Sequence, residues 1–389
     1  MADNKQTQSI LFRAPFDVRR MIFSYSCPSA VHVHIKNDKV VISECVSPDA
    51  IHDQSDGSDR KADLPPPGRR WDREDDYLYA QRLMSTWGPH WRCEEAARRQ
   101  QRDLKPSTLL SMLDVCKLMR DEIADLMVRD AVFNVTDVYT SLKLLTDRAS
   151  MMALNCTFED IRKLDITLRL PEIIFRAIEQ DEDKASKNYE SLIALAPTTG
   201  STEVGPWHEV CGRLAQLPKL TKMRLWLDHD QRGYWARVDE RAFLTPLITS
   251  LEHKDVDVAL HLPFANPRWE DPERHFEQDK VAPRIHVDRR KRQRKFGYVT
   301  VLGRLEVHDY LDFPCMDETT PVFGDMDADQ RLAMERRLWK DGENMQLWRN
   351  GGMHISTCMK SFVDSSVREQ NWVGREKELG CTLKWPAVL

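Results

Sequence analysis

The chain has 389 residues, 41% of them hydrophobic and 31% charged, which suits one large domain or two smaller ones and excludes wholesale disorder. The formal net charge of −5 at pH 7 gives no overall attraction for nucleic acid or an anionic membrane, so such binding would need a local basic patch. No stretch approaches the roughly 18 apolar residues of a membrane helix, and residues 1–9 lack a signal-peptide core, so we expect a cytoplasmic or nuclear protein without membrane contact.

The first predicted element is a short amphipathic helix that begins near Pro15, a residue tolerated in a first helical turn. Five apolar residues follow at helical spacing and are candidate partner-binding residues: Phe16, Val18, Met21, Ile22 and Tyr25. Their stripe would dock into the groove of a partner protein, or it would pack on the chain's own helix at 107–130.

Two β-rich runs, 31–35 and 40–42, flank a polar turn and predict a hairpin. His32 and His34 lie two residues apart, so both side chains point to one face, where Cys27 or Cys45 could complete part of a metal site. A half-exposed strand face explains them equally well, and the spacing fixes no second pair of ligands. We therefore predict no metal and no cofactor.

Residues 47–104 form a polar insertion. Residues 47–73 are rich in Asp, Ser, Pro and Arg and predict a loop or disorder, because they bury too little apolar surface to offset their ordering entropy. Residues 77–102 predict a charged helix to which Trp87 and Trp91 give some apolar contact.

The clearest helical pattern covers 107–130, where apolar residues recur along one stripe. Cys116 lies on this stripe and is expected to be an inert core thiol. The nine cysteines show no C-x-x-C spacing, so we expect free thiols.

The middle third repeats a loose pattern of helix, turn and alternating strand. Strands are predicted within 161–168, 214–227 and 247–262, each of the last two preceded by a helical stretch. Such units resemble leucine-rich repeats, in which parallel strands share one sheet and helices back it, although the spacing is irregular. A curved α/β layer is expected.

Tryptophans gather in the same region: Trp207, Trp226, Trp235 and Trp269. They would line a recognition surface or pack in the core; Trp226 and Trp235 are candidate partner-binding residues. Asp228, His229 and Asp230 follow a predicted strand and are interpreted as a polar strand end. No G-x-S-x-G, H-E-x-x-H, P-loop or G-x-G-x-x-G motif is present, so we predict that the chain is not an enzyme.

A basic run ends the polar stretch 265–295. Its members are Arg289, Arg290, Lys291, Arg292, Arg294 and Lys295. The run is a candidate nuclear-targeting signal or phosphate-contacting patch, and the alternative is a solvated loop. A strand at 298–307 and a helix at 327–349, capped by Asp327 with Gln330 three residues on, complete the predicted elements.

Several segments together resemble a known family. Residues 12–25, Phe-Arg-Ala-Pro-Phe-Asp-Val-Arg-Arg-Met-Ile-Phe-Ser-Tyr, resemble the F-box-like opening Leu-Pro-x-Glu-Ile-Arg-x-x-Ile-Tyr-x-Tyr of a large family of fungal proteins of unknown function. Residues 109–133 resemble that family's Leu-Leu-x-Val-Cys-Arg-Gln-Ile-x-x-Glu-Ala helix, and 161–168 and 217–227 resemble its later strands. The resemblance covers roughly 10–262 and implies a fold, with a Skp1-type adaptor as the partner of the opening segment.

We therefore predict an α/β fold, with α+β as the alternative. Its regions are an F-box-like helix and hairpin (10–46), the polar insertion (47–104), a helix and irregular strand–helix core (105–262), a polar basic loop (263–296), and a C-terminal strand, helix and tail (297–389). The expected function is protein–protein interaction, as an F-box-like adaptor that recognises a protein substrate. The alternatives are a nuclear nucleic-acid-associated protein that uses 289–295, and an unrecognised enzyme.

Overall fold

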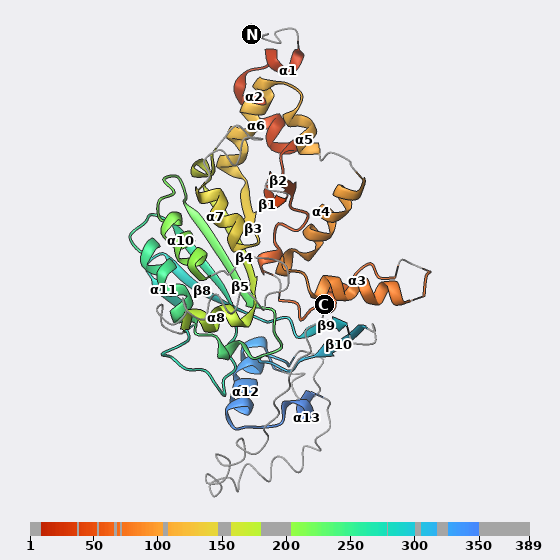
Figure 1. Cartoon of the computed structure of the whole chain (residues 1–389), viewed down its shortest axis with the longest axis vertical. Coiled ribbons are helices and arrows are strands. Elements are labelled where there is room, and N and C mark those ends of the chain that lie inside the picture. The colour runs from red at the N-terminus through yellow and green to blue at the C-terminus, as the bar shows by residue number, and fades with distance from the viewer. Residues whose placement is uncertain are drawn as a thin grey trace, which may run out of the picture.

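A computed structural model describes residues 9–349 except 37–38, 53, 66–67, 71, 104–107, 147–156, 180–203, 278, 300–304 and 317–325. Its centre is one eight-stranded sheet (Figure 1). In spatial order the strands are β2 (Lys39–Glu44), β1 (Ala30–Lys36), β3 (Val132–Val135), β4 (Lys163–Leu170), β5 (Lys222–His229), β6 (Asp257–Pro263), β8 (Ile285–Arg290) and β7 (Asp279–Ala282).

The six strands from β1 to β8 run parallel, and antiparallel hairpins close both edges. Among the described strands, the parallel ones follow one another in chain order without a reversal. Each crossover therefore advances the chain by one strand in the same direction, which keeps the crossover helices on one face. The predicted α/β class is confirmed, and so are strands at each of the three middle positions.

In the described part of the chain, that face is covered by α7 (Val138–Thr146), α8 (Glu172–Glu179), α10 (Val204–Leu214) and α11 (Glu240–Leu251), and it is here called the helix face (Figure 1). Helix α6 (Lys117–Asp130) lies at one end of the sheet and packs its buried residues against the same core. Alternate strand residues, such as Leu164, Ile166 and Leu168 of β4, point into the core between sheet and helices. This core is almost entirely aliphatic and aromatic.

The other strand residues point to the opposite face, here called the insertion face, because residues 47–104 cover it. These residues form η1 (Ala50–His52), η2 (Ser58–Lys61), α3 (Arg73–Leu83), η3 (Gly88–His90) and α4 (Trp91–Asp103). The expectation of loop or disorder at 47–73 differs from this structure: Ile51 and Arg60 are buried there. Arg60 donates to the carbonyl oxygens of Arg82 and Gly88, so polar contacts replace the apolar burial that the segment lacks.

The helix predicted over 107–130 is divided. It forms α5 (Thr108–Leu113) and α6, with Cys116 in extended conformation as the N-cap of α6, where its Sγ accepts from the Met119 amide at 3.4 Å. Cys116 is therefore half-buried at a helix start rather than inside a continuous core stripe. A thiol acceptor can take the capping place more often filled by Ser or Asp.

At the N-terminal end, α1 (Ile10–Arg13) and α2 (Phe16–Ser26) precede the hairpin. At the other end, β9 (Lys295–Val299) and β10 (Leu305–Asp309) form a two-stranded sheet, followed by α12 (Ala328–Lys340) and α13 (Met345–Arg349). Two further 3-10 turns are η5 (Phe158–Asp160) and η6 (Trp235–Arg237). The predicted cap of Asp327 with Gln330 is confirmed as a capping box, although the helix ends at Lys340 and restarts at Met345.

Candidate functional site

Helix α2 carries apolar residues on two sides. Phe23 is buried against the core, and Arg19 on the same side forms an ion pair with Glu122 of α6, with an Nε–Oε2 distance of 3.0 Å. On the other side Val18, Met21, Ile22 and Tyr25 are exposed, Tyr25 at 87%. We call these four residues the α2 face.

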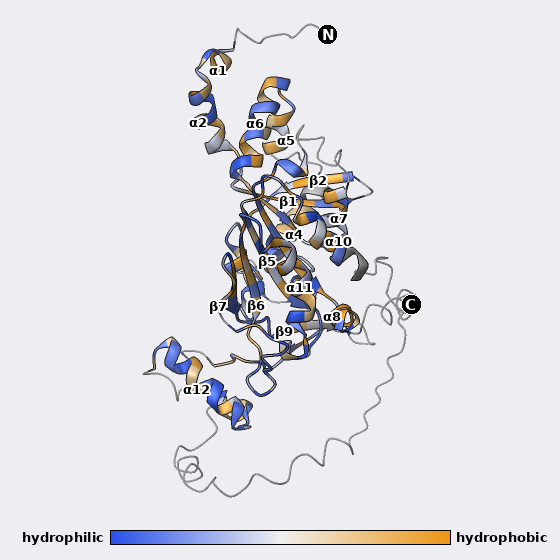
Figure 2. Cartoon of the chain, turned by 90° about the vertical axis from the view of Figure 1, so that its left-hand side faces the viewer, coloured by the Kyte–Doolittle hydropathy of each residue, from blue (hydrophilic) through white to orange (hydrophobic). Residues whose placement is uncertain are grey.

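Helix α2 lies with α1 near one end of the molecule (Figure 2). Phe16, the fifth residue of the predicted stripe, is half exposed and lies near the Arg19 guanidinium, 5.9 Å from it. The helix thus packs on α6 through Phe23 and Arg19, and the predicted stripe is turned mostly outward. Of the two interpretations of this stripe, the geometry is compatible with partner docking.

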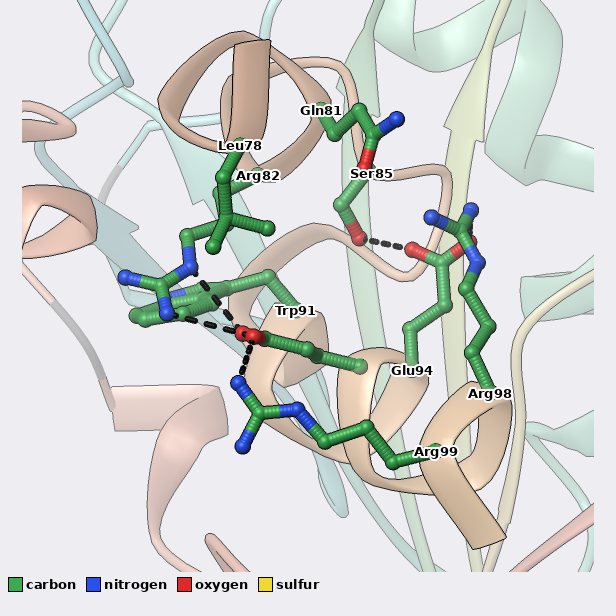
Figure 3. A pocket seen from close by; sticks show the side chains of 9 residues that line it. Leu78, Gln81, Arg82, Ser85, Trp91, Glu94, Arg98 and Arg99 are labelled. Atoms are coloured by element: carbon green, nitrogen blue, oxygen red, sulfur yellow. Dashed lines mark hydrogen bonds and ion pairs between the residues drawn. The ribbon is translucent and has the colours of Figure 1, made fainter. Parts of the chain in front are cut away.

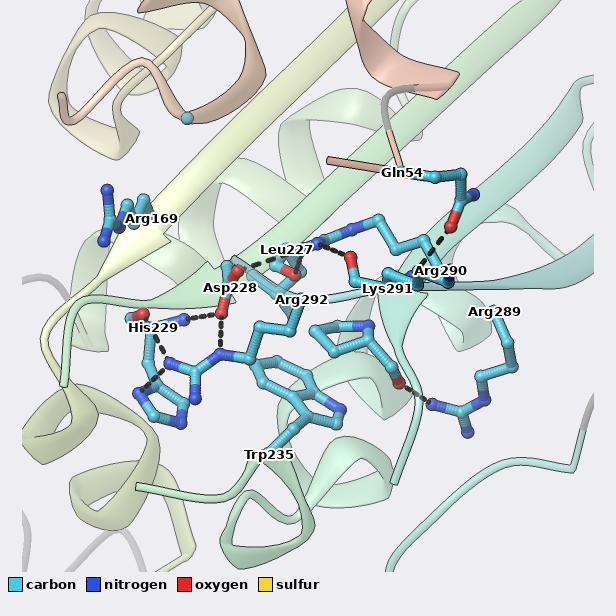
Figure 4. Close-up of polar contacts among 12 residues, drawn as sticks. Gln54, Arg169, Leu227, Asp228, His229, Trp235, Arg289, Arg290, Lys291 and Arg292 are labelled. Carbon is cyan, nitrogen blue, oxygen red and sulfur yellow. Dashed lines mark hydrogen bonds and ion pairs between the residues drawn. The ribbon is translucent and has the colours of Figure 1, made fainter. Parts of the chain in front are cut away.

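The arginine side chains of the basic run 289–295 lie inside the fold (Figure 4), and its lysines are half-buried. Arg289 donates two hydrogen bonds to Glu240, at 2.5 and 2.8 Å. Arg292 donates to Asp228 at 2.7 Å, and Arg294 to Asp56 at 3.0 Å. The segment is therefore not a solvated loop in the folded chain, because these arginines form ion pairs with internal carboxylates.

Asp228 is the centre of this network. It is buried and lies 2.7 Å from Arg292 and 3.4 Å from Arg290. Burial alone would raise the pKa of its carboxyl, but the two guanidinium charges hold that pKa below its usual range. Burial lowers the pKa of His229 beside it, so this imidazole is neutral. The interpretation of 228–230 as a polar strand end agrees with a structural ion-pair network.

The two tryptophans predicted to bind a partner are buried. Trp226 packs beneath the Arg290 guanidinium, whose carbon lies 3.8 Å from the ring centroid, and Trp235 donates to Glu240 at 2.6 Å. Trp207 is also buried, whereas Trp269 is 43% exposed. Trp226 and Trp235 therefore pack inside the folded chain, as the alternative interpretation had it, and do not line its surface.

A shallow pocket lies between α3 and α4 (Figure 3). Its volume is about 190 Å³, and each of its charged groups has an ion-pair partner: Arg82 and Arg99 both bond Glu95, and Ser85 and Arg98 both bond Glu94. Because these charges are already paired, the pocket offers little to a charged ligand.

Four potential metal ligands converge on the insertion face. They are His32 of β1, Cys45 after β2, His90 of η3 and Cys93 of α4, all buried, with ligand atoms within 4.8 Å of one another. The expectation of no metal rested on the lack of a second ligand pair. That pair is His90-x-x-Cys93, a spacing that could have been found in the sequence.

A hydrogen bond joins the two cysteines of this cluster. The thiol of Cys45 lies 3.7 Å from the Sγ of Cys93, and this hydrogen bond, with the neighbouring His32 and His90, lowers the pKa of Cys93. The same contact raises the pKa of Cys45. Burial lowers the pKa of His32, so its imidazole is neutral. Thiolate and neutral imidazole are the forms that bind metal.

Comparison with known proteins gives the family and nothing finer. Neither a curated protein nor a solved structure matches the chain, and none of the helices in its described part is long and apolar enough to cross a membrane. The resemblance to a family of unknown function is confirmed at that level. Residues 4–281 match the model of the Domain of unknown function DUF7730, and the chain belongs to this family.

Proposed function

We propose that the chain is a protein-interaction module that docks on a partner protein through the α2 face. The observation that carries the proposal is that α2 is apolar on both sides while only one side is packed. A surface helix ordinarily turns a polar side to water, so a second apolar side is typical of a helix that also contacts a partner.

The partner that fits this face has an apolar groove with an acidic border. The α2 face is a stripe at i, i+3, i+4 and i+7 (residues 18, 21, 22 and 25), the arrangement that inserts into a hydrophobic groove. Arg13, just before this helix, is exposed and favours negative charge beside the groove. A Skp1-type adaptor is the partner that the resemblance of residues 12–25 to an F-box-like opening implies.

The sheet supports the same role for the rest of the chain. Parallel strands in chain order with helices on one face are the arrangement expected of a leucine-rich-repeat-like layer. The insertion covers the strands on the opposite face, so a surface that recognises a substrate would be formed by the insertion or the helices and not by the strands themselves. The chain would then join a ligase adaptor at one end to a protein substrate elsewhere. This second step rests on fold-level analogy.

The test is co-purification of the intact chain with a Skp1-type protein. Val18→Asp and Ile22→Asp place a charge on the α2 face and should abolish co-purification. Ile173→Asp is the matched control, because Ile173 of α8 is 47% exposed and Ile22 is 42% exposed. If the intact chain never retains the adaptor, or the α2 variants retain it as well as the control does, the proposal is wrong.

The nucleic-acid alternative draws no support from residues 289–295. Four arginines of the run are held by internal carboxylates or carbonyl oxygens, and a cation already paired releases fewer counterions when it meets a phosphate. Salt-dependent binding of DNA or RNA at low ionic strength would revive that alternative.

A further inference from the structure

The His–Cys cluster on the insertion face has the geometry of a metal site. Three of its distances join atoms that would be ligands: 3.7 Å between the two Sγ atoms, and 3.7 and 3.8 Å from the His90 Nδ1 to Cys45 and Cys93. A tetrahedral zinc ion with Zn–S near 2.3 Å and Zn–N near 2.0–2.1 Å sets S–S edges of about 3.8 Å and S–N edges of about 3.6 Å. The observed triangle therefore matches one face of such a tetrahedron.

His32 supplies the fourth corner. Its ring lies edge-on to that of His90 at 4.7 Å between centroids and is stacked on Trp87 at 4.8 Å. The largest separation among the four ligand atoms is 4.8 Å, about 1 Å beyond a tetrahedral edge. Binding of the ion would therefore require the His32 imidazole to move by about that distance.

The imidazoles have unmet bonding capacity. Both ring nitrogens of His32 and the Nε2 of His90 are buried and make no hydrogen bond within the described residues. A buried polar atom without a partner costs roughly 1–3 kcal/mol, so native proteins rarely leave several together. The hydrogen bonds of the two thiols to the Nδ1 of His90 leave these three atoms unpartnered. A bound cation would take the lone pair of one His32 nitrogen and so remove one part of this cost, while the Nε2 of His90 would stay without a partner among the described residues.

Charge also favours a divalent ion. Two thiolates and two neutral imidazoles carry −2, so a divalent cation makes the buried unit neutral and avoids the penalty of an isolated charge. Two sulfur and two nitrogen ligands in tetrahedral arrangement are typical of zinc. Four protein ligands leave no open position, which is the mark of a structural rather than a catalytic ion.

We propose that His32, Cys45, His90 and Cys93 bind one structural zinc ion that fastens the insertion to the edge hairpin of the sheet. The ligands come from β1, from the residue after β2, and from the η3–α4 junction, so the ion joins segments separated by up to 61 positions in the chain. It would thereby hold the insertion, residues 47–104, against the sheet. This site is independent of the α2 face.

The first experiment measures metal in the intact chain, expressed with added zinc and purified without chelator. About one zinc per chain is expected. Cys93→Ser and His90→Ala should lose it, and Cys211→Ser should keep it. Cys211 is the matched control, because it is also a buried free thiol but lies in α10 on the helix face. Zinc that persists in Cys93→Ser, or that disappears in Cys211→Ser, overturns the assignment.

A second measurement needs no variant and covers the case in which Cys93→Ser does not fold. The intact chain is stripped of metal with a chelator and titrated with Co²⁺. A tetrahedral ligand-field spectrum with thiolate-to-cobalt charge transfer, saturating at one equivalent and displaced by zinc, is expected. A folded chain that shows no thiolate band contradicts the proposal. Val18→Asp should bind zinc normally, so this result is separable from that of the docking experiment.

Discussion

The two faces of the sheet are stabilised by different physics. On the helix face, Leu164, Leu225 and Leu260 belong to one continuous apolar core, where burial is non-directional and one aliphatic side chain can substitute for another. On the insertion face, the neighbouring residues Asp165 and Arg224 form an ion pair at 2.5 Å, and Asp228 holds two arginines. On the insertion face, ion pairs between specific side chains therefore take the place of non-directional apolar burial.

The difference has a consequence for robustness. A core tolerates changes that preserve volume, but a buried ion pair does not tolerate the loss of one member, because the other remains charged in a poorly solvated place. The insertion face should therefore be the more sensitive to single polar substitutions. The helix face should be sensitive mainly to lost volume.

The largest effect is expected at Arg292. Its guanidinium donates to Asp228 at 2.7 Å and to the carbonyl oxygens of His229 and Gln231 at 2.9 and 2.7 Å. Arg292→Met should lower the free energy of unfolding by about 3–5 kcal/mol, since a buried carboxylate loses its closest cation. Chemical denaturation of the variant and the unchanged chain measures this loss. Lys291→Met is the control within the same run, and its side chain is partly exposed. Equal losses in both variants would remove the distinction between the two faces.

On the helix face, Leu225 is fully buried in the middle of β5. Leu225→Ala should cost about 3 kcal/mol through lost transfer energy and a residual cavity, while Leu225→Met, which keeps the volume, should cost less than about 1.5 kcal/mol. Leu118→Ala on the exposed side of α6 serves as the control and should change the unfolding midpoint little. A Met variant as destabilised as the Ala variant would show that this face, too, depends on specific geometry.

The sequence predicted the helix face far better than the insertion face. Strand β4 could be located because Leu164, Ile166 and Leu168 alternate with other residues, and this alternation is local. The insertion face depends on pairs that are far apart in the chain: Arg292 and Asp228 are separated by 64 positions. The run of arginines therefore suggested an exposed loop, because the carboxylates that pair with these arginines lie far away in the sequence.

The cluster of four metal ligands was not predicted from the sequence for the same reason. His32 pointed to a possible site, but its partners arrive through a hairpin and through a segment whose composition predicts disorder. Only His90-x-x-Cys93 was a local signal. Conversely, the exposed stripe of α2 was identified from its periodicity, while periodicity alone could not decide whether it faces the core or the solvent.

Two buried acids, Asp228 and Asp312, sharpen the comparison through the pH dependence of stability. Asp228 has two arginines near it, whereas Oδ2 of Asp312 makes no hydrogen bond among the described residues. Burial raises the pKa of Asp312 to about 6. The unfolded chain loses this proton near pH 4 but the folded chain keeps it to about 6, so this group makes the protein less stable as pH rises through that window.

Asp312→Asn removes that titration. The variant should gain stability relative to the natural chain between pH 4 and pH 7, by up to roughly 2–3 kcal/mol. Denaturation midpoints of both proteins at the two pH values give the difference directly. Other acids titrate equally in both proteins and cancel. A stability difference that does not change with pH would mean that Asp312 is ionised throughout, as Asp228 is expected to be.

The smallest effect tests how closely the insertion approaches the sheet. Gly88 in η3 has φ of +55°, and a Cβ there would lie 2.9 Å from the ring of Trp226 on β5. Gly342 has φ of +78° with no atom within 4 Å of its Cβ position. Both Gly→Ala variants incur backbone strain of about 1 kcal/mol. Gly88→Ala should lower the free energy of unfolding by about 1–2 kcal/mol more than Gly342→Ala does, and this difference measures the contact with the indole.

Because Gly88 is two residues from His90, the Gly88→Ala variant should also weaken zinc binding if the insertion is displaced as a unit. Equal losses in the two glycine variants would show that the insertion can move away from the sheet without a measurable penalty.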